Sequence, residues 1–183
     1  KDLRIEDGEG TLSLGYHTYN SSGTGKGLFY DCPLETLYLG RNLSYNTSSN
    51  YGYSPFYNIK TLASVIIGNS VTDIGDSAFE GCTGLKTVYN FSNLTFSKGS
   101  SNNGYIAYYA TKVINAPNAV IDGDLIWCNL NGANTLACYL GEVAELTLSA
   151  DYNGENYVIG NDAFNGCTGL TSIVIPNSVT SIG

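Results

Sequence analysis

The amino-acid sequence predicts a β-rich α/β solenoid, in which each turn of roughly 23 residues holds one short parallel strand and a short return segment. The first observation is a near-copy, because residues 74–85 return almost unchanged as residues 159–170. Residues 69–75 likewise return as residues 177–183. The two copies are displaced by 85 and by 108 positions, and these displacements differ by 23. Such a period is typical of stacked repeats, which bury their apolar sides only against one another.

A strand opens each turn, as the clearest copy indicates. Val65 and Ile67 alternate with outward residues in the way that a strand shows one face to a core. A return segment follows, with turn-forming Asn and Gly residues. It reaches the motif Ala-Phe-x-x-Cys at residues 78–82, which can hold at most one turn of α- or 3₁₀-helix. We expect the Phe of each clear copy, Phe79 and Phe164, to be buried between neighbouring turns.

Weaker copies extend the pattern toward the N-terminus. Residues 56–62 keep the Phe-to-Leu spacing of six, and residues 29–34 are the same unit one residue short. Residues 12–14 are expected to form one more strand before them. Ser, Asn, Gly and Tyr dominate residues 18–26 and 44–54, so we expect these insertions to be loops that project between turns.

The repeated pattern, I-G-x-x-A-F-x-x-C-x-x-L-x-x-I-x-I-P-x-S-V-T-x-I-G, resembles the BspA-type leucine-rich repeat of bacterial surface proteins. The resemblance covers residues 12 to about 88 and then residues 159–183. It implies a right-handed leucine-rich-repeat solenoid. It also implies a non-catalytic adhesion module that is secreted or located at the cell surface. The implied partners are host extracellular proteins or bacterial surface proteins.

The middle of the chain departs from the repeat. Residues 124–128 and 135–140 are expected to be strands around a turn at Asn131-Gly132, which predicts an inserted hairpin. Residues 145–148 are expected to form a third strand that returns to the solenoid sheet. The spacing of apolar residues in 104–110 fits either a short helix or a strand.

One elongated repeat domain over residues 1–183 is the expected organisation. It comprises N-terminal repeats (1–89), degenerate turns with the inserted hairpin (90–158) and the start of further repeats (159–183). A separate middle domain is disfavoured, because about seventy residues with few long apolar runs would form a marginal core. The chain begins with Lys and ends within a repeat, so we expect it to be part of a longer protein.

Composition excludes several functions. The formal net charge is −8, and the eight basic residues are scattered singly, which disfavours nucleic acid as a partner. No apolar run approaches the roughly 18 residues of a membrane-spanning helix, so no membrane insertion is expected. The 15 Tyr residues, together with Ser, Asn and Gly, are typical of adaptable protein-binding surfaces. Secreted β-rich proteins are often rich in Tyr and Asn without any binding role, so this alternative explanation of the composition stays open.

The five cysteines fall into two groups. Cys32, Cys82 and Cys167 occupy one position of the repeat, where a buried structural thiol is expected. Cys128 and Cys138 are equidistant from a turn centred near Gly132-Ala133 and could face each other across the hairpin. They could form a disulfide in an oxidising compartment, or stay free.

Other polar motifs have simpler explanations than catalysis. His17 is the only histidine, so the chain offers no histidine pair or triad to choose from. Residues 23–27 lack the spacing of a phosphate-binding loop. Residues 122–124 and 151–155 place carboxylates beside glycines, but neither completes a calcium loop, and turn formation explains both. We therefore predict no catalytic, cofactor-binding or metal-binding residues, and no cofactor.

Outward positions of the strands are expected to form two columns on the concave face of the solenoid. One column holds small hydroxyl side chains, and the other holds tyrosine and aliphatic side chains. The predicted partner-binding residues are Thr36, Tyr38, Ser64, Ile66, Thr87, Tyr89, Ser172 and Val174. Exposed aromatic and aliphatic side chains beside small hydroxyls are typical of binding hot spots. Ordinary cross-strand packing is the alternative explanation.

Together these features predict a non-catalytic, protein-binding module. A passive stalk or spacer that presents another domain is the alternative, because a solenoid is a scaffold without a built-in active site. A hydrolase is the third possibility, and none of the residue patterns supports it.

Overall fold

The computed structural model describes residues 1–15, 26–46 and 54–183 of the chain. The chain divides into two compact units, residues 1–115 (unit 1) and residues 116–183 (unit 2). The boundary therefore falls within the middle segment that departs from the repeat. One elongated domain over the whole chain stays a prediction.

Some expectations lie outside the described residues. His17 is one of them, together with most of the expected loops 18–26 and 44–54 and of the glycine-rich motif 23–27.

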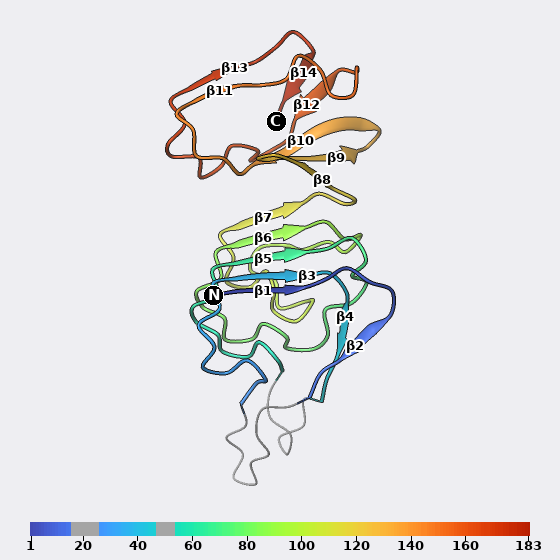
Figure 1. The fold of residues 1–183 in the computed structure, drawn as a ribbon, viewed down its shortest axis with the longest axis vertical. Helices are drawn as coiled ribbons and strands as arrows, with labels where there is room; N and C mark the ends of the chain where they lie inside the picture. Colours follow the sequence, from blue (N-terminus) through green and yellow to red (C-terminus); the bar gives the residue numbers. More distant parts are fainter. Residues whose placement is uncertain (16–25, 47–53) are drawn as a thin grey trace. The chain divides into compact units, whose positions relative to one another are not determined.

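Five strands of unit 1 form one parallel sheet in the order β1-β3-β5-β6-β7 (Figure 1). They are β1 (Asp2–Ile5), β3 (Thr36–Leu39), β5 (Ser64–Ile67), β6 (Thr87–Asn90) and β7 (Lys112–Asn115). Leu37, Val65 and Val88 are paired in register and buried, as the alternating pattern predicts. One short parallel strand per turn is thus confirmed in this unit.

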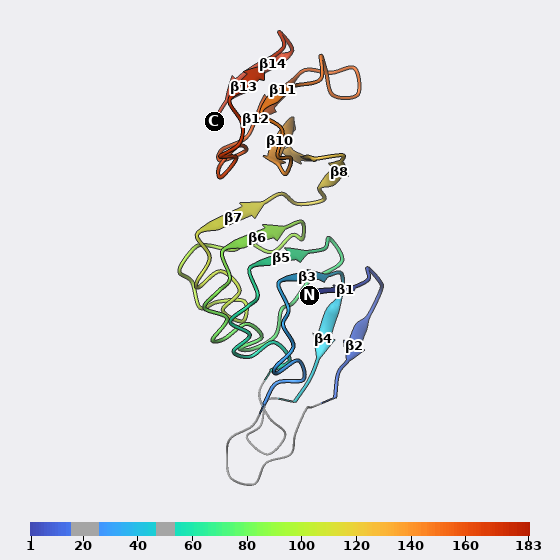
Figure 2. The ribbon, with the colours of Figure 1, turned by 60° about the vertical axis from the view of Figure 1, so that its left-hand side comes forward.

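Two further strands of unit 1 lie on the return side of the first turns. β2 (Thr11–Ser13) and β4 (Asn42–Ser44) pair in parallel, with Leu12 opposite Leu43 (Figure 2). The strand expected at residues 12–14 therefore belongs to this second, smaller sheet. The first strand of the main sheet is β1, which the sequence analysis missed although Leu3 and Ile5 alternate there with charged residues.

A stack of aromatic rings fills the core between the return segments of unit 1. The rings of Phe29 and Phe56 lie 5.2 Å apart, and those of Phe56 and Phe79 lie 5.3 Å apart. Interplanar angles of 5° and 10° make both pairs parallel stacks. Phe56 and Phe79 are fully buried, so the expected burial of Phe79 between turns is confirmed.

The return segments are turns, and no described residue is helical, which corrects the expected α/β class to an all-strand one. Cys82 and Leu85 each donate a backbone N–H to the carbonyl three residues earlier. The left-handed backbone of Ser77 (φ 54°) and Gly81 (φ 78°) interrupts this run. Isolated turns form as a result, because a helix needs consecutive right-handed residues. Residues 104–110 also form turns rather than a helix or a strand.

Unit 2 contains a mixed sheet and a separate strand pair. The sheet follows the order β14-β12-β10-β9-β8. Its strands are β8 (Val120–Asp122), β9 (Leu125–Leu130), β10 (Ala133–Tyr139), β12 (Tyr157–Ile159) and β14 (Val179–Ile182). β8, β9 and β10 pair antiparallel, whereas β10, β12 and β14 pair in parallel. The remaining strands, β11 (Glu145–Thr147) and β13 (Ser172–Val174), form a parallel pair, which places the strand expected at residues 145–148 beside the next repeat.

The core of unit 2 surrounds Trp127, which stacks on Tyr152 at 4.2 Å and meets Tyr157 edge-on at 5.0 Å. Phe164 packs against this core but is only half-buried. The expected burial of Phe164 equal to that of Phe79 is therefore wrong. Its ring contacts Tyr139 at 6.0 Å in a tilted arrangement rather than within a parallel stack.

No disulfide joins any two of the five cysteines, all of which lie within the described residues. The turn at Asn131-Gly132 joins β9 to β10, but Cys128 and Cys138 do not face each other across it. Cys128 lies opposite Thr135, and Cys138 lies opposite Ile126 beyond a register shift. Ile126 and Cys128 are two residues apart on β9, so the two cysteines are offset by about 7 Å along the hairpin and are not cross-strand partners.

Of the three cysteines in the repeat position, only Cys82 is buried, which corrects the expectation for the other two. Cys167 is half-buried and Cys32 is exposed. Leu85 donates its N–H to the carbonyl of Cys82, three residues earlier, at 3.0 Å. Leu34 instead bonds to the carbonyl of Cys32, two residues earlier, at 2.8 Å. The first turn is one residue short, and this tighter bond leaves the Cys32 side chain on the outside.

Candidate functional site

Six of the eight predicted binding residues lie together in unit 1. They form what we call the strand face, the outward side of β3, β5 and β6, which carries Thr36, Tyr38, Ser64, Ile66, Thr87 and Tyr89. The three hydroxyl residues are paired in register across the strands, and so are Tyr38, Ile66 and Tyr89. Thr36 is exposed, and the other five side chains are half-buried. The sheet thus holds two columns of accessible side chains in fixed spacing.

The remaining two predicted residues, Ser172 and Val174, lie on β13 in unit 2. Their register partners on β11 are Glu145 and Thr147. Val174 is 55% exposed, more than any residue of β3, β5 or β6 in the aliphatic and aromatic column. These two side chains form a separate outward pair within unit 2.

Tyr38 is held by two charged residues of the N-terminal segment. Its hydroxyl donates to Asp7 Oδ2 at 2.7 Å, and the Arg4 guanidinium lies 3.7 Å above its ring. Burial, and then the hydrogen bond to Asp7, raise the pKa of Tyr38 to about 12. Because one ring face and the hydroxyl of Tyr38 are already occupied, Ile66 is a better anchor for a partner than Tyr38.

Charges at the β1 end of the sheet are largely paired with one another. Lys1 forms a salt bridge with Glu35, and Arg4 forms one with Glu6. The hydroxyl of Thr36 donates to a carboxylate oxygen of Asp2. This end therefore combines both signs of charge in a solvated network.

Polar side chains, among them buried Asn90 and half-buried Asn115, fix the ends of β6 and β7. Asn90 donates from Nδ2 to the Leu94 carbonyl and to Asn115 Oδ1, the latter at 2.8 Å. Its Oδ1 accepts from the backbone N–H and the hydroxyl of Ser92. Asn115 in turn exchanges two hydrogen bonds with the backbone of Phe96. A satisfied buried network of this kind rigidifies its surroundings. The sequence analysis missed it, although Asn90 replaces the apolar residue that ends the strand in earlier turns.

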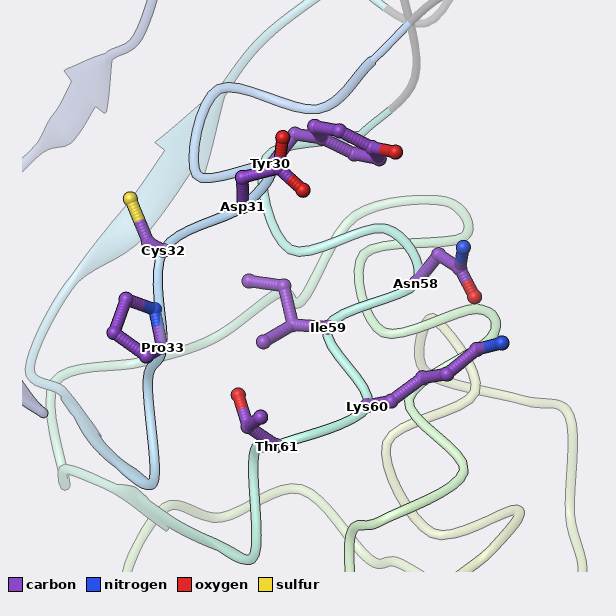
Figure 3. A pocket seen from close by; sticks show the side chains of 8 residues that line it. All are labelled: Tyr30, Asp31, Cys32, Pro33, Asn58, Ile59, Lys60 and Thr61. Carbon is purple, nitrogen blue, oxygen red and sulfur yellow. The ribbon is translucent and has the colours of Figure 1, made fainter.

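A groove of about 380 Å³ lies between two return turns of unit 1 (Figure 3). It is lined by Tyr30, Asp31, Cys32, Pro33, Asn58, Ile59, Lys60 and Thr61. The Cys32 thiol points away from the other side chains, while Ile59 points toward the first turn. The groove exists because the short first turn does not fill the space that Ile59 and Thr61 border.

A second groove, of about 340 Å³, lies where β2 and β4 meet the following return segment. Tyr45 lines it and donates its hydroxyl to the Asp76 carbonyl at 3.1 Å. Burial, followed by the nearby carboxylates of Asp73 and Asp76, raises the pKa of Tyr45. The phenol therefore stays neutral and serves as a hydrogen-bond donor.

The acidic motifs form turns. Gly123, at φ 55°, lies in the tight turn between β8 and β9. The carboxylate of Asp151 accepts the N–H of Gly154 at 2.8 Å, and Tyr152 and Glu155 pair across that turn. Within residues 1–15, 26–46 and 54–183, no three His, Cys, Asp or Glu side chains are grouped so that they could hold a metal ion. The same residues contain no helix with the length and apolar character needed to cross a membrane.

A family model for the BspA type leucine rich repeat region matches residues 17–107 and 145–183 of the chain, in six copies. The chain belongs to this family. No curated protein matches the sequence, and no solved structure matches it.

The family match extends the repeat beyond what the sequence analysis assigned. It continues past residue 88 to residue 107 and resumes at residue 145 instead of residue 159. The structure gives the reason in unit 2, because β11 begins at Glu145 and pairs in parallel with β13. The segment that precedes β11 lacks the Ala-Phe-x-x-Cys motif by which the clear copies were recognised.

Proposed function

We propose that this chain is a non-catalytic protein-binding module that engages its partner through the strand face. Membership of a leucine-rich-repeat family supports an interaction scaffold. We assign partner binding to the strand face because its two columns of side chains are in register across the strands. Ile66 lies between Tyr38 and Tyr89 on neighbouring parallel strands, with the hydroxyl column beside them.

The strand face suits binding because its side chains are already ordered. The inward residues of the same strands are buried in one continuous core, so the outward residues have little freedom to lose on association. Tyrosine offers a large contact area with few rotatable bonds, and neighbouring hydroxyls can donate or accept hydrogen bonds. Central aromatic and aliphatic anchors of this kind account for most of the energy in protein interfaces.

The finer parts of the proposal concern the surroundings of the chain. We place the module at the cell surface or among secreted proteins, where it would adhere to host extracellular or bacterial surface proteins. A right-handed solenoid in one elongated domain, with the hairpin inserted, belongs to the same proposal. Ser172 and Val174 would form a second outward pair for binding within unit 2. The alternative is a passive spacer that presents another domain.

Capture experiments with matched variants test this function. The immobilised chain, the double variant Ile66→Ser/Tyr89→Ser and the control Tyr108→Ser are exposed to host extracellular fluid. Tyr108 suits the control because it is 45% exposed on a return turn of the same unit. We expect wild type and control to retain the same protein and the strand-face variant to lose at least about tenfold in affinity.

Two results would contradict the proposal. Equal capture by all three chains would place the contact elsewhere than the strand face. Binding that resides only in sequences attached to this chain would favour the spacer.

A further inference from the structure

We propose that the partner presents an acidic residue to the β6–β7 end of the strand face, where Lys86 and Lys112 lie together. This inference rests on the proposed function and names the chemistry of the partner segment. The segment would be extended, with a carboxylate at one position and a large apolar side chain two residues away.

The backbone places the two lysines side by side. Lys86 directly precedes β6, and its carbonyl accepts the N–H groups of both Thr111 and Lys112 at 2.9 Å. Lys112, the first residue of β7, is paired in register with Thr87. Neighbouring strands are about 4.8 Å apart, so both ammonium groups can reach one carboxylate between them. The Thr87 hydroxyl belongs to the same column and can donate to that carboxylate.

Charge along the sheet makes this end distinct. At the β1 end, the cations Lys1 and Arg4 already have the carboxylates of Glu35 and Glu6 as partners. Lys86 is exposed, and no salt bridge to it occurs among residues 1–15, 26–46 and 54–183. The whole chain carries a net charge of −8, which repels an acidic partner over most of its surface. Lys86 is therefore a cation on this sheet with which a partner's carboxylate can pair, and Lys112 adds positive charge beside it.

The apolar anchor lies at a fixed distance from the lysines. Tyr89 is two residues beyond Thr87 on the same outward side of β6, and Ile66 is its register partner on β5. Two residues of strand span about 6.6 Å, which equals the spacing of alternate side chains in an extended peptide. The predicted recognition pattern is thus an acidic residue, any residue, and then an aromatic or aliphatic residue.

Peptide selection against the whole chain supplies the probe. A phage library of random linear dodecapeptides is selected on the immobilised chain, and the consensus peptide is synthesised for affinity measurements by fluorescence anisotropy. We expect Asp or Glu followed two positions later by a large apolar residue. Affinity should fall with rising salt concentration, because surface charge pairs are screened.

Charge reversal then tests the two lysines. Lys86→Glu/Lys112→Glu should weaken binding of the consensus peptide at least about tenfold. Lys98→Glu is the matched control, since Lys98 is exposed on a loop of the same unit, and it should leave affinity unchanged. Circular dichroism checks the folding of each variant. If the double reversal does not fold, Lys86→Gln alone provides the measurement, with a smaller loss expected.

The outcomes separate this inference from the proposed function. Selected peptides without acidic residues, or affinity unchanged by charge reversal but lost in Ile66→Ser/Tyr89→Ser, would overturn the acidic partner and leave the strand face as the binding surface. If neither set of substitutions changes the affinity of the consensus peptide, both proposals are overturned.

Discussion

Residues 78–85 and 163–170 have nearly the same sequence, yet they differ in burial. Phe79 and Cys82 are fully buried in unit 1. Their counterparts in unit 2, Phe164 and Cys167, are half-buried. The local backbone is the same in both copies, since Ser77 and Asp162 adopt φ values of 54° and 58°. The repeat motif therefore determines the turn, but not how deeply its side chains are buried.

Neighbouring turns account for the difference. The Phe79 ring stacks on Phe56, and its N–H donates to the Gly104 carbonyl of the following turn at 2.8 Å. Cys82 donates its thiol to the Phe56 carbonyl at 3.0 Å, whereas the corresponding contact from Cys167 to Tyr139 measures 3.7 Å. Phe164 has Tyr139 as its aromatic neighbour, in a tilted contact rather than a parallel stack. In a repeat protein, burial is thus shared between adjacent turns.

Truncating the two phenylalanines gives the largest expected effect. Phe79→Ala should lower the free energy of unfolding by about 3–5 kcal/mol, through lost apolar contact and the cavity left in the ring stack. Phe164→Ala should cost about half as much, because part of its ring already faces solvent. Denaturant unfolding of both variants, followed by circular dichroism, measures the difference. Equal losses of unfolding free energy would show that the two turns are packed alike and would contradict the difference in burial between Phe79 and Phe164.

Thiol labelling compares the cysteines of the two units. Burial raises the pKa of Cys82 to about 11, so at pH 8 only about one thiol in a thousand is ionised there. Burial likewise raises the pKa of Cys128 to about 11. We expect exposed Cys32 to react first, half-buried Cys167 more slowly, and the remaining three only after unfolding. Mass spectrometry of peptides from the labelled chain gives the order.

One labelling result would overturn the turn assignment. If Cys82 were modified under native conditions as fast as Cys32, the repeat position would face solvent in both turns. Cys32→Ser serves as the control, since it should remove the fast phase and leave the others unchanged.

Alkaline pH should destabilise both units through tyrosines that are held neutral. The pKa of Tyr38 is raised to about 12 and that of Tyr157 is also raised, in both cases chiefly by burial. The unfolded chain loses these protons near pH 10, before the folded chain does. The contribution of these tyrosines to stability is therefore constant well below pH 10 and falls as pH rises toward 12. Tyr38→Phe and Tyr157→Phe should each reduce the loss of unfolding free energy at alkaline pH. At neutral pH, each substitution should lower that free energy by about 1 kcal/mol, because one hydrogen bond is lost. Unfolding at several pH values would contradict the assignment if the variants kept the full alkaline loss.

The smallest expected effect concerns the left-handed residue before each motif. Ser77→Gly should stabilise unit 1 by about 0.5 kcal/mol, because glycine adopts positive φ without the clash of a β-carbon. Ser77→Ala is the matched control and should be neutral or slightly destabilising. Asp162→Gly should gain less, since the Asp162 carboxylate also accepts a hydrogen bond from Asn165. If thermal melts show that Ser77→Ala is more stable than Ser77→Gly, residue 77 does not adopt the left-handed backbone that it shares with Asp162.

Most of the fold could be predicted where the sequence pattern is local. Alternation of apolar residues located β5 and β6, and the Asn-Gly pair located the turn between β9 and β10. Features set by contacts between distant residues were not predictable. The shift in register after Leu136 places Cys138 opposite Ile126 instead of Leu125, and no local pattern indicates it. A single missing residue in the first return segment was visible in the sequence, but its effect on Cys32 required the hydrogen-bond geometry.

The candidate site was predicted to a similar extent. Outward positions on β3, β5 and β6 followed directly from the strand period. The engagement of Tyr38 by Arg4 and Asp7 could not be foreseen, because β1 had not been recognised as a strand. The family match shows that the repeat persists where its sequence signature is weak.

The parallel ladder of unit 1 also determines how the chain would respond to mechanical load. Its backbone hydrogen bonds point from one turn to the next, so a pull along the stacking direction would load the turns in series and open them one at a time. A folded turn occupies about 4.8 Å of that direction, while its 23 residues extend to roughly 80 Å when released. Each turn would thus store length, and unit 1 would extend in separate steps rather than all at once.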